Sequence, residues 1–464
     1  MASEDQATGK GTAPPVGPSA QEQTNPPPLD FQRKRRRTIL FDALVGVILA
    51  VALVGTREWF EKNTESGKWI EFSTYDIIES ILASKPIPEK IPITIVDLSG
   101  LKTEGIQAAQ KGDQATPRDK RLKDPLEKLV NLGAEGIAVD VDFSPQETYR
   151  TPDDPSFFQF CLDLWKHRHA PIYLGVWQRQ ALPRQLWLLD PSYEKLGVSI
   201  LAPRLQTQNM VKCFQLHAQS ECGPTLSEAL AGELLKDTPP PSHFVARHPR
   251  LFQAVSTEEL SKNVSVGTFP VDFSPLSNLR TSDHTIRSLE LNELEANARL
   301  IEGHVVLVGD VRSPEPSDEF RVPGQLDQVP GVYVHACAIY TLTQAPLYIF
   351  TRATRWGVDL LLALLIILAV AGLRLYHNSR TTPEVAVTRV QGTLTIVVVV
   401  IVLLVSAVFV HRTRLLWDDF LLVMFTFLMH PSVEHYLKAM GQWLRRTAPG
   451  AWRNFILGAE KGQS

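Results

Sequence analysis

The sequence predicts an α/β domain with a mainly parallel sheet, held at a membrane by four transmembrane helices, one before the domain and three after it. Two observations predict the sheet. Short runs of β-branched and aliphatic residues recur along the chain, and helical patterns lie between them. A third observation predicts the anchor, because four apolar runs flank residues 57–351, one before them and three after them.

The first predicted span is residues 38–56, an apolar run long enough to cross a hydrocarbon core of ~30 Å at about 1.5 Å per residue. Before it, residues 1–37 are rich in Pro and polar residues, which predicts a disordered tail, and they end in a run of basic residues. Basic residues before a span favour a cytoplasmic N-terminus. No cleavage site of small residues follows the span, so it is predicted to be an uncleaved anchor, with residue 57 onward outside.

Residues 57–84 carry aromatic and aliphatic side chains at helical spacing, so we expect a helix that couples the membrane to the domain mechanically. Beyond it, near-continuous apolar runs predict strands that are buried on both faces. Apolar stripes predict helices between or after these strands, and Gly133 is expected to end the first helix. The expected strands are residues 91–97, 136–142, 170–176 and 304–309, and the expected helices are residues 118–132, 156–165 and 332–344.

Strand, helix and strand in succession are typical of right-handed crossover units, which favours the parallel sheet. Residues 178–300 are less regular, and we assign no strand of the main sheet to them.

The later spans are predicted at residues 356–375, 392–410 and 415–430. Basic residues in the loop between the first two of these favour a cytoplasmic loop, which agrees with the cytoplasmic N-terminus. The last run reaches only about 22 Å as a helix, so a re-entrant segment remains an alternative to a full span. Residues 431–464 mix aromatic, aliphatic and basic residues, as expected for an amphipathic cytoplasmic tail at the membrane surface.

The net charge of −3 excludes the strongly basic classes, so we expect no nucleic-acid partner. Four cysteines fall within residues 57–351, where an oxidising compartment permits disulfides. Cys213 and Cys222 are close enough in sequence to form one, although the pattern leaves this open. Cys161 and Cys337 are expected to be small buried side chains.

The candidate site is an acidic edge of the sheet. Asp97, Asp140, Asp142 and Asp310 each lie at or just after the carboxyl end of an expected strand, where open α/β sheets bind ligands. Such carboxylates suit a cation or a cationic or hydroxyl-rich small molecule. The alternative is that each of them caps a helix or forms a turn, which is common at strand ends.

Two further residues complete the candidate set. Arg118 follows a Pro at the start of an expected helix and is placed to pair with the acidic edge or to bind an anionic group, although a capping salt bridge is an alternative. His335 lies within the expected helix 332–344, where a packed and hydrogen-bonded histidine is the alternative to a ligand. No catalytic motif, metal-ligand spacing or cofactor-binding loop is present in the sequence, so we expect neither an enzyme nor a cofactor.

Residues 57–350 resemble a CHASE domain of the second type, an extracytoplasmic sensory module of bacterial receptors. The order and spacing of several short segments carry the resemblance, and the arrangement of one span before and three after is also typical of that family. The segments are residues 74–78, 93–97, 116–118, 129–140, 143–145, 153–154, 282–287, 305–309, Asp318 and 330–336. The sequence departs from the family at Ala115 and Thr116, where tryptophans are usual, and at Val322-Pro323, where Thr-Pro is usual.

The resemblance implies a multi-pass protein of the bacterial inner (cell) membrane with a sensory domain outside and both termini in the cytoplasm. Members usually carry an output domain after the last span, and residues 431–464 are too few for one, so we expect a separate cytoplasmic or membrane effector. The leading hypothesis is therefore a sensor or adaptor. It binds an unknown small-molecule or protein ligand outside and signals through its helices.

The alternative is a structural subunit of an oligomeric membrane complex, and homo-oligomerisation stays open under either hypothesis. A third hypothesis, a hydrolase that uses the acidic edge, has less support because no catalytic motif accompanies the acids.

Overall fold

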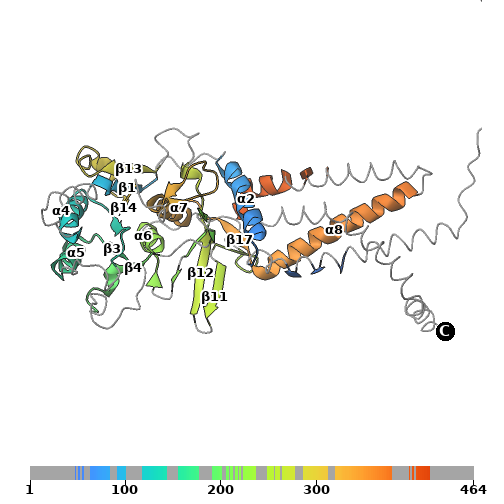
Figure 1. Cartoon of the computed structure of the whole chain (residues 1–464), viewed down its shortest axis with the longest axis horizontal. Coiled ribbons are helices and arrows are strands. Elements are labelled where there is room, and N and C mark those ends of the chain that lie inside the picture. The colour runs from blue at the N-terminus through green and yellow to red at the C-terminus, as the bar shows by residue number, and fades with distance from the viewer. Residues whose placement is uncertain are drawn as a thin grey trace, which may run out of the picture.

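A computed structural model describes most of the domain and parts of the segments around it (Figure 1). The described residues are 63–83, 91–100, 118–143, 155–176, 191–200, 223–236, 248–254, 256–261, 264–276, 286–311, 319–378 and 404–417, with short pieces within 47–56, 205–220 and 397–401. The predicted tails 1–37 and 431–464 and much of the predicted first, third and fourth spans lie outside these residues.

A six-stranded sheet forms the centre of the domain, in the order β13-β1-β14-β2-β3-β4. Each neighbouring pair in it is parallel. Every residue of β1, β2, β3 and β14 is buried, as the continuous apolar runs predict. The strands are β1 (Ile93–Asp97), β2 (Gly136–Val139), β3 (Ile172–Val176), β4 (Gly197–Ser199), β13 (Arg287–Glu290) and β14 (Val305–Gly309). The predicted α/β class with a mainly parallel sheet is confirmed.

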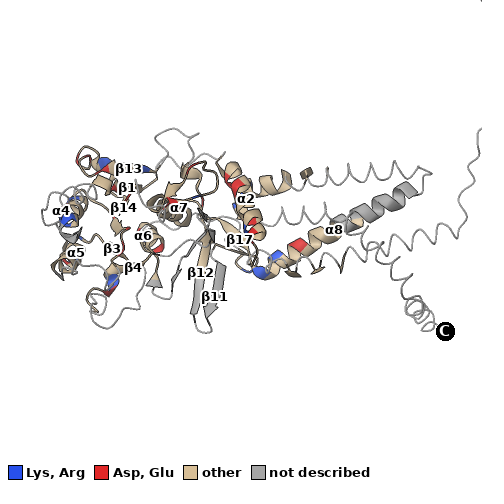
Figure 2. Cartoon of the chain, in the orientation of Figure 1, with Lys and Arg blue, Asp and Glu red and all other residues tan. Residues whose placement is uncertain are grey.

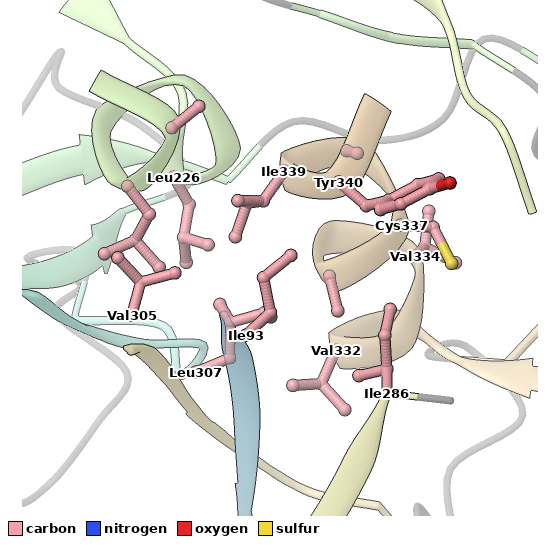
Figure 3. Packing of buried hydrophobic residues seen from close by; sticks show 14 of the residues in the cluster. Ile93, Leu226, Ile286, Val305, Leu307, Val332, Val334, Cys337, Ile339 and Tyr340 are labelled. Atoms are coloured by element: carbon pink, nitrogen blue, oxygen red, sulfur yellow. The ribbon is translucent and has the colours of Figure 1, made fainter. Parts of the chain in front are cut away.

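Two helices cover each face of the sheet. The pair α4 (Arg118–Asn131) and α5 (Pro155–Arg168) lies on one face, and α6 (Leu226–Leu235) and α7 (Gly331–Thr343) lie on the other. Leu122, Leu126 and Leu129 on α4 pack on the first face with Val96 and Val306. Figure 3 shows the second face, where residues of α6 and α7 meet side chains of β1 and β14. The domain is thus a three-layer sandwich with a core on each side of the sheet.

Gly133 ends α4 as expected. It has a φ of +83°, its N–H donates to the carbonyl of Val130 at 3.1 Å, and the N–H of Ala134 donates to the carbonyl of Leu129 at 3.2 Å. This pair of bonds is the Schellman arrangement, in which a left-handed residue satisfies the last helical carbonyls. It directs the chain from α4 into β2.

The region 178–300 is more ordered than the sequence analysis expects, because it supplies β4, β13 and α6 to the sandwich. Edge strands are hard to recognise. In β13, Arg287, Ser288 and Glu290 are partly or fully exposed and only Leu289 is buried. In contrast, α6 carries a sequence signal that we did not use, since Thr225 caps its N-terminus and Glu228 follows three residues later.

Smaller elements complete the domain. Antiparallel pairing joins β11 (Ser256–Ser261) to β12 (Val264–Pro270) and β12 to β7 (Gln215–His217). The remaining short elements are β5 (Leu205–Thr207), β6 (Met210–Lys212), β8 (Gln219–Ser220), β9 (Gly223–Pro224), β15 (Glu319–Phe320), β16 (Val329–Pro330) and the 3-10 turns Glu194–Leu196, Ser274–Leu276 and Ala298–Leu300.

A separate apolar cluster forms where the predicted spans meet the domain. It joins α2 (Glu65–Leu82), β17 (Tyr348–Phe350), α8 (Arg352–Asn378), β18 (Leu415–Leu416) and the helical segment 404–413. In it β17 pairs with β10 (Phe252–Gln253) on one side and with β18 on the other. Within the described residues α2 begins at Glu65, later than the expected helix 57–84. Leu415 and Leu416, which begin the predicted fourth span, form a strand.

Among the residues that the structure describes, no helix has both the length and the apolar content needed to cross a membrane.

Candidate functional site

The chain connections change direction at the carboxyl edge of the sheet. The chain leaves β1 and β2 toward α4 and α5 on one face, whereas it leaves β14, which lies between them, toward α7 on the other. Neighbouring connections that leave in opposite directions mark a topological switch point, where open α/β sheets bind ligands. Asp97 ends β1, Asp310 follows β14 and Asp140 follows β2, so the strand order places these three residues side by side along this edge.

Asp97 holds two loops together. Its Oδ1 accepts from the N–H of Ser99 at 2.8 Å and from the N–H of Val311 at 3.2 Å, and its Oδ2 accepts from the hydroxyl of Ser99 at 2.7 Å. These bonds join the turn after β1 to the residue that follows Asp310. Asp97 therefore forms a turn, which the sequence analysis gives as the alternative to ligand binding.

Asp140 has a different environment. Its N–H donates to the carbonyl of Val308 at 2.8 Å, which fixes its backbone beside β14. Its side chain is only 10% exposed, and no hydrogen-bond donor among the described residues reaches the carboxylate. Burial raises the pKa of this carboxyl to about 6, because the charged form loses hydration without a hydrogen bond in return.

The N-terminal part of α7 packs close to Asp140. Gly309 makes this approach possible, since a Cβ there would lie 2.9 Å from Cγ2 of Val332 and 3.2 Å from Cβ of Asp140. From α7, the Nε2 of His335 lies 4.0 Å from Oδ1 of Asp140. The Nδ1 of the same ring shares a hydrogen bond with the hydroxyl of Ser227 on α6 at 2.9 Å. Asp140 and Ser227 therefore face opposite nitrogens of one buried imidazole.

The remaining predicted residues are less closely tied to this group. Asp310 is buried at the end of β14, and Asp142 is partly exposed two residues after Asp140. Arg118 begins α4, but its side chain lies outside the described residues, as do Cys213 and Cys222. Cys161 and Cys337 are free and buried, as expected.

This geometry favours binding over nucleophilic chemistry. Asp140, His335 and Ser227 are the residue types of a hydrolytic triad, but Ser227 is only 1% exposed, so a substrate cannot reach its hydroxyl without a rearrangement. The 4.0 Å between Asp140 and His335 also exceeds a hydrogen bond. Within the described ranges, no three acidic, His or Cys side chains are grouped to hold a metal ion. A desolvated carboxylate such as that of Asp140 is suited to a group that donates hydrogen bonds to it.

The sequence analysis did not identify Ser227, nor a second buried polar group formed by Glu79, Asp272 and Arg414 at the base of the domain. The cap at Thr225 predicts α6 and therefore places Ser227 in its first turn. Asp272 and Arg414 are 142 residues apart, so no local pattern links them.

Comparison with known proteins supports the sensory interpretation. The model of the CHASE2 domain family matches residues 46–374, which is most of the chain. No curated protein and no solved structure matches the chain. The chain belongs to the CHASE2 family of extracytoplasmic sensory domains.

Proposed function

We propose that this protein is a membrane-anchored sensor that binds a small cationic or hydroxyl-rich ligand at the carboxyl ends of β1, β14 and β2 and signals to a separate effector. The observation that carries this proposal is Asp140, a carboxylate that is nine-tenths buried at a topological switch point. Its raised pKa reflects an unfavourable loss of hydration. A ligand that donates a hydrogen bond or brings a positive charge relieves this cost, so the site favours such a ligand.

The exposed apolar surface of α8 supports the membrane anchor. Leu361, Leu365 and Leu368 are each more than half exposed along this helix. Figure 2 shows charged residues on the first turns of α8, followed by described turns that are uncharged. A row of exposed leucines is costly in water and favourable in lipid.

The meeting point of the spans also supports the predicted topology. A Cβ at Gly55, near the end of the first predicted span, would lie 3.9 Å from Cη2 of Trp356 near the start of α8. The pairing of β18 with β17 brings the end of the third predicted span to the same end of the domain. Three spans that all meet the domain at one end agree with a domain on one face of the membrane.

Ligand stabilisation of the full-length chain in nanodiscs tests the proposal. Thermal unfolding is followed with a panel of amines, polyamines, amino acids and sugars. A ligand that binds the native state at a hundred times its Kd adds about 2.7 kcal/mol to the unfolding free energy. The Asp140→Asn variant keeps the shape of the side chain but removes its charge, so the shift should disappear for a cationic ligand.

Glu295→Gln is the matched control, because Glu295 is also acidic but is 75% exposed and pairs with Lys128 at 2.9 Å on the surface. The control should respond to ligand as the wild type does. A panel that stabilises neither protein, together with a large assembly of fixed mass in detergent, would instead support the structural-subunit hypothesis. Equal stabilisation of the wild type and Asp140→Asn by every ligand would place the site elsewhere.

A further inference from the structure

Arg414 has an unusual backbone and an unusual location. It ends the helical segment 404–413, with its N–H donating to the carbonyl of Val410 at 2.9 Å. Its φ is +55°, in the left-handed region that glycine adopts easily and a long side chain adopts at a cost. The residue is nevertheless only 9% exposed. This conformation directs the guanidinium into the base of the domain.

The buried guanidinium binds three groups there. It forms an ion pair with Asp272, and its Nη2 donates to the carbonyl of Ala345 at 2.8 Å. Its Nε donates to the carbonyl of Pro346 at 3.3 Å. The main-chain carbonyl of Arg414 in turn accepts from the N–H of Tyr348 at 2.9 Å. Hydrogen bonds therefore hold the end of the segment 404–413 against residues 345–348, which follow α7.

Asp272 extends the connection to α7 itself and to α2. This residue is fully buried, and its Oδ1 accepts from the N–H of Ser274 at 2.9 Å. Its own N–H donates to the hydroxyl of Thr341, on the last turn of α7, at 2.8 Å. The next residue, Phe273, donates its N–H to Oε2 of Glu79 on α2 at 3.2 Å.

Three ionisable side chains meet at this junction, Glu79, Asp272 and Arg414. Burial, followed by the nearby charge of Asp272, raises the pKa of Glu79 well above its ordinary value. The protonated form of Glu79 is therefore favoured beside the ion pair of Arg414 and Asp272. A buried pair of this kind contributes little net stability compared with apolar side chains, but removing one partner leaves an uncompensated buried charge. The segment 404–413 therefore docks favourably only where the guanidinium of Arg414 meets the carboxylate of Asp272.

One helix connects this junction with the candidate ligand site. Near the start of α7, Val332 packs against Gly309 and His335 faces Asp140. Near the end of α7, the hydroxyl of Thr341 accepts a hydrogen bond from the N–H of Asp272. Thr341 lies nine positions after Val332 on α7, which is about 14 Å along the helix. A helix of this length moves as a rigid unit, so a shift at one end reaches the other.

We propose that the Arg414–Asp272 pair couples α7 to the third membrane segment, so that a change at Asp140 alters how the segment 404–413 docks on the domain. This inference rests on the proposed function, because it assigns the route by which the sensor transmits a change to the membrane. Arg414 acts in it as a positioning residue, since it does not touch the ligand site.

A double-mutant cycle on the full-length chain in nanodiscs tests the coupling. Asp140→Asn perturbs the ligand site and Arg414→Gln perturbs the junction, and hydrogen exchange is followed in peptides covering 331–345 and 404–417. Arg412→Gln is the matched control, because Arg412 is exposed two residues before Arg414. Arg414→Gln should raise exchange in 404–417 about a hundredfold, whereas Arg412→Gln should change it less than about threefold.

Two such distant substitutions act additively unless something couples them. We expect Asp140→Asn to change exchange in 404–417 when Arg414 is present and to leave it unchanged, within about twofold, in the Arg414→Gln background. If the change in exchange of the double variant equals the product of the two single-variant changes within about twofold, the coupling is overturned. If Arg414→Gln does not fold, Arg414→Lys replaces it, since Lys keeps the charge but loses the planar fork.

The cycle contains no ligand, so a failed ligand search does not alter its result. Conversely, a ligand that binds at Asp140 while the cycle stays additive would leave the sensor proposal intact and overturn this one.

Discussion

Replacing Asp140 with Asn should stabilise the protein at neutral pH, although such a change in a buried polar residue usually destabilises. The pKa of this carboxyl rises from 3.8 to about 6 on folding. At 1.36 kcal/mol per unit, the ionised form costs the native state about 3 kcal/mol above pH 6. Asn has the same shape without the charge, and after its own desolvation we expect a net gain of about 1–3 kcal/mol at pH 7.5.

The pH dependence gives a sharper test than the gain itself. A carboxyl whose pKa is raised in the folded state contributes stability that is complete below its unfolded pKa, 3.8, and is lost as the pH rises through about 6. Between pH 7.5 and pH 5 the wild type should therefore recover about 1.4 kcal/mol from this residue, and Asp140→Asn should recover none of it.

Thermal unfolding of the full-length chain in detergent, at both pH values, measures this difference. Subtracting the wild-type and variant curves removes the contribution of every other titrating group, and Glu295→Gln serves as the control at an exposed acid. An Asp140→Asn variant that is less stable than the wild type at pH 7.5, or a difference that does not vary with pH, would refute the assignment of Asp140 as a desolvated carboxylate.

The remaining predictions concern packing around the same sheet. Gly309→Ala should cost about 1–3 kcal/mol in thermal unfolding and weaken ligand binding, because the added methyl meets Val332 at 2.9 Å; unchanged stability would contradict the close approach of α7. Leu126→Ala should cost about 2–5 kcal/mol, because Leu126 is fully buried between α4 and the sheet, and a loss under ~1 kcal/mol would be inconsistent with that core. Burial raises the pKa of the Cys161 thiol, so iodoacetamide should modify it only after denaturation, as mass spectrometry can report, and rapid labelling of the native chain would show that the thiol is accessible.

The central strands could be predicted from sequence because burial on both faces leaves an unbroken apolar run. Each of β1, β2, β3 and β14 lies within the range expected for it. β4 and β13 could not be predicted in this way, because β4 has three residues and β13 exposes most of its side chains at the edge of the sheet. Short edge strands take their conformation from the neighbour with which they pair.

The position of three candidate acids on one edge of the sheet could be predicted, but their individual environments could not. The rule that ligands bind at carboxyl ends of parallel strands identified Asp97, Asp140 and Asp310 from the sequence. It could not separate Asp97, whose carboxylate is satisfied by Ser99 and Val311, from Asp140, which lacks such partners among the described residues. That distinction depends on loop geometry and burial, which sequence periodicity does not contain.

The sensor proposal depends first on which side of the membrane the domain occupies. A Glu295→Cys variant, with Cys213 and Cys222 replaced by Ser, carries one exposed thiol on the domain, because Cys161 and Cys337 are buried. Intact cells are treated with a membrane-impermeant maleimide and the labelled fraction is compared with that of lysed cells. Labelling in intact cells to the level reached after lysis is the expected result, and a thiol that reacts only after lysis would contradict an extracytoplasmic sensor.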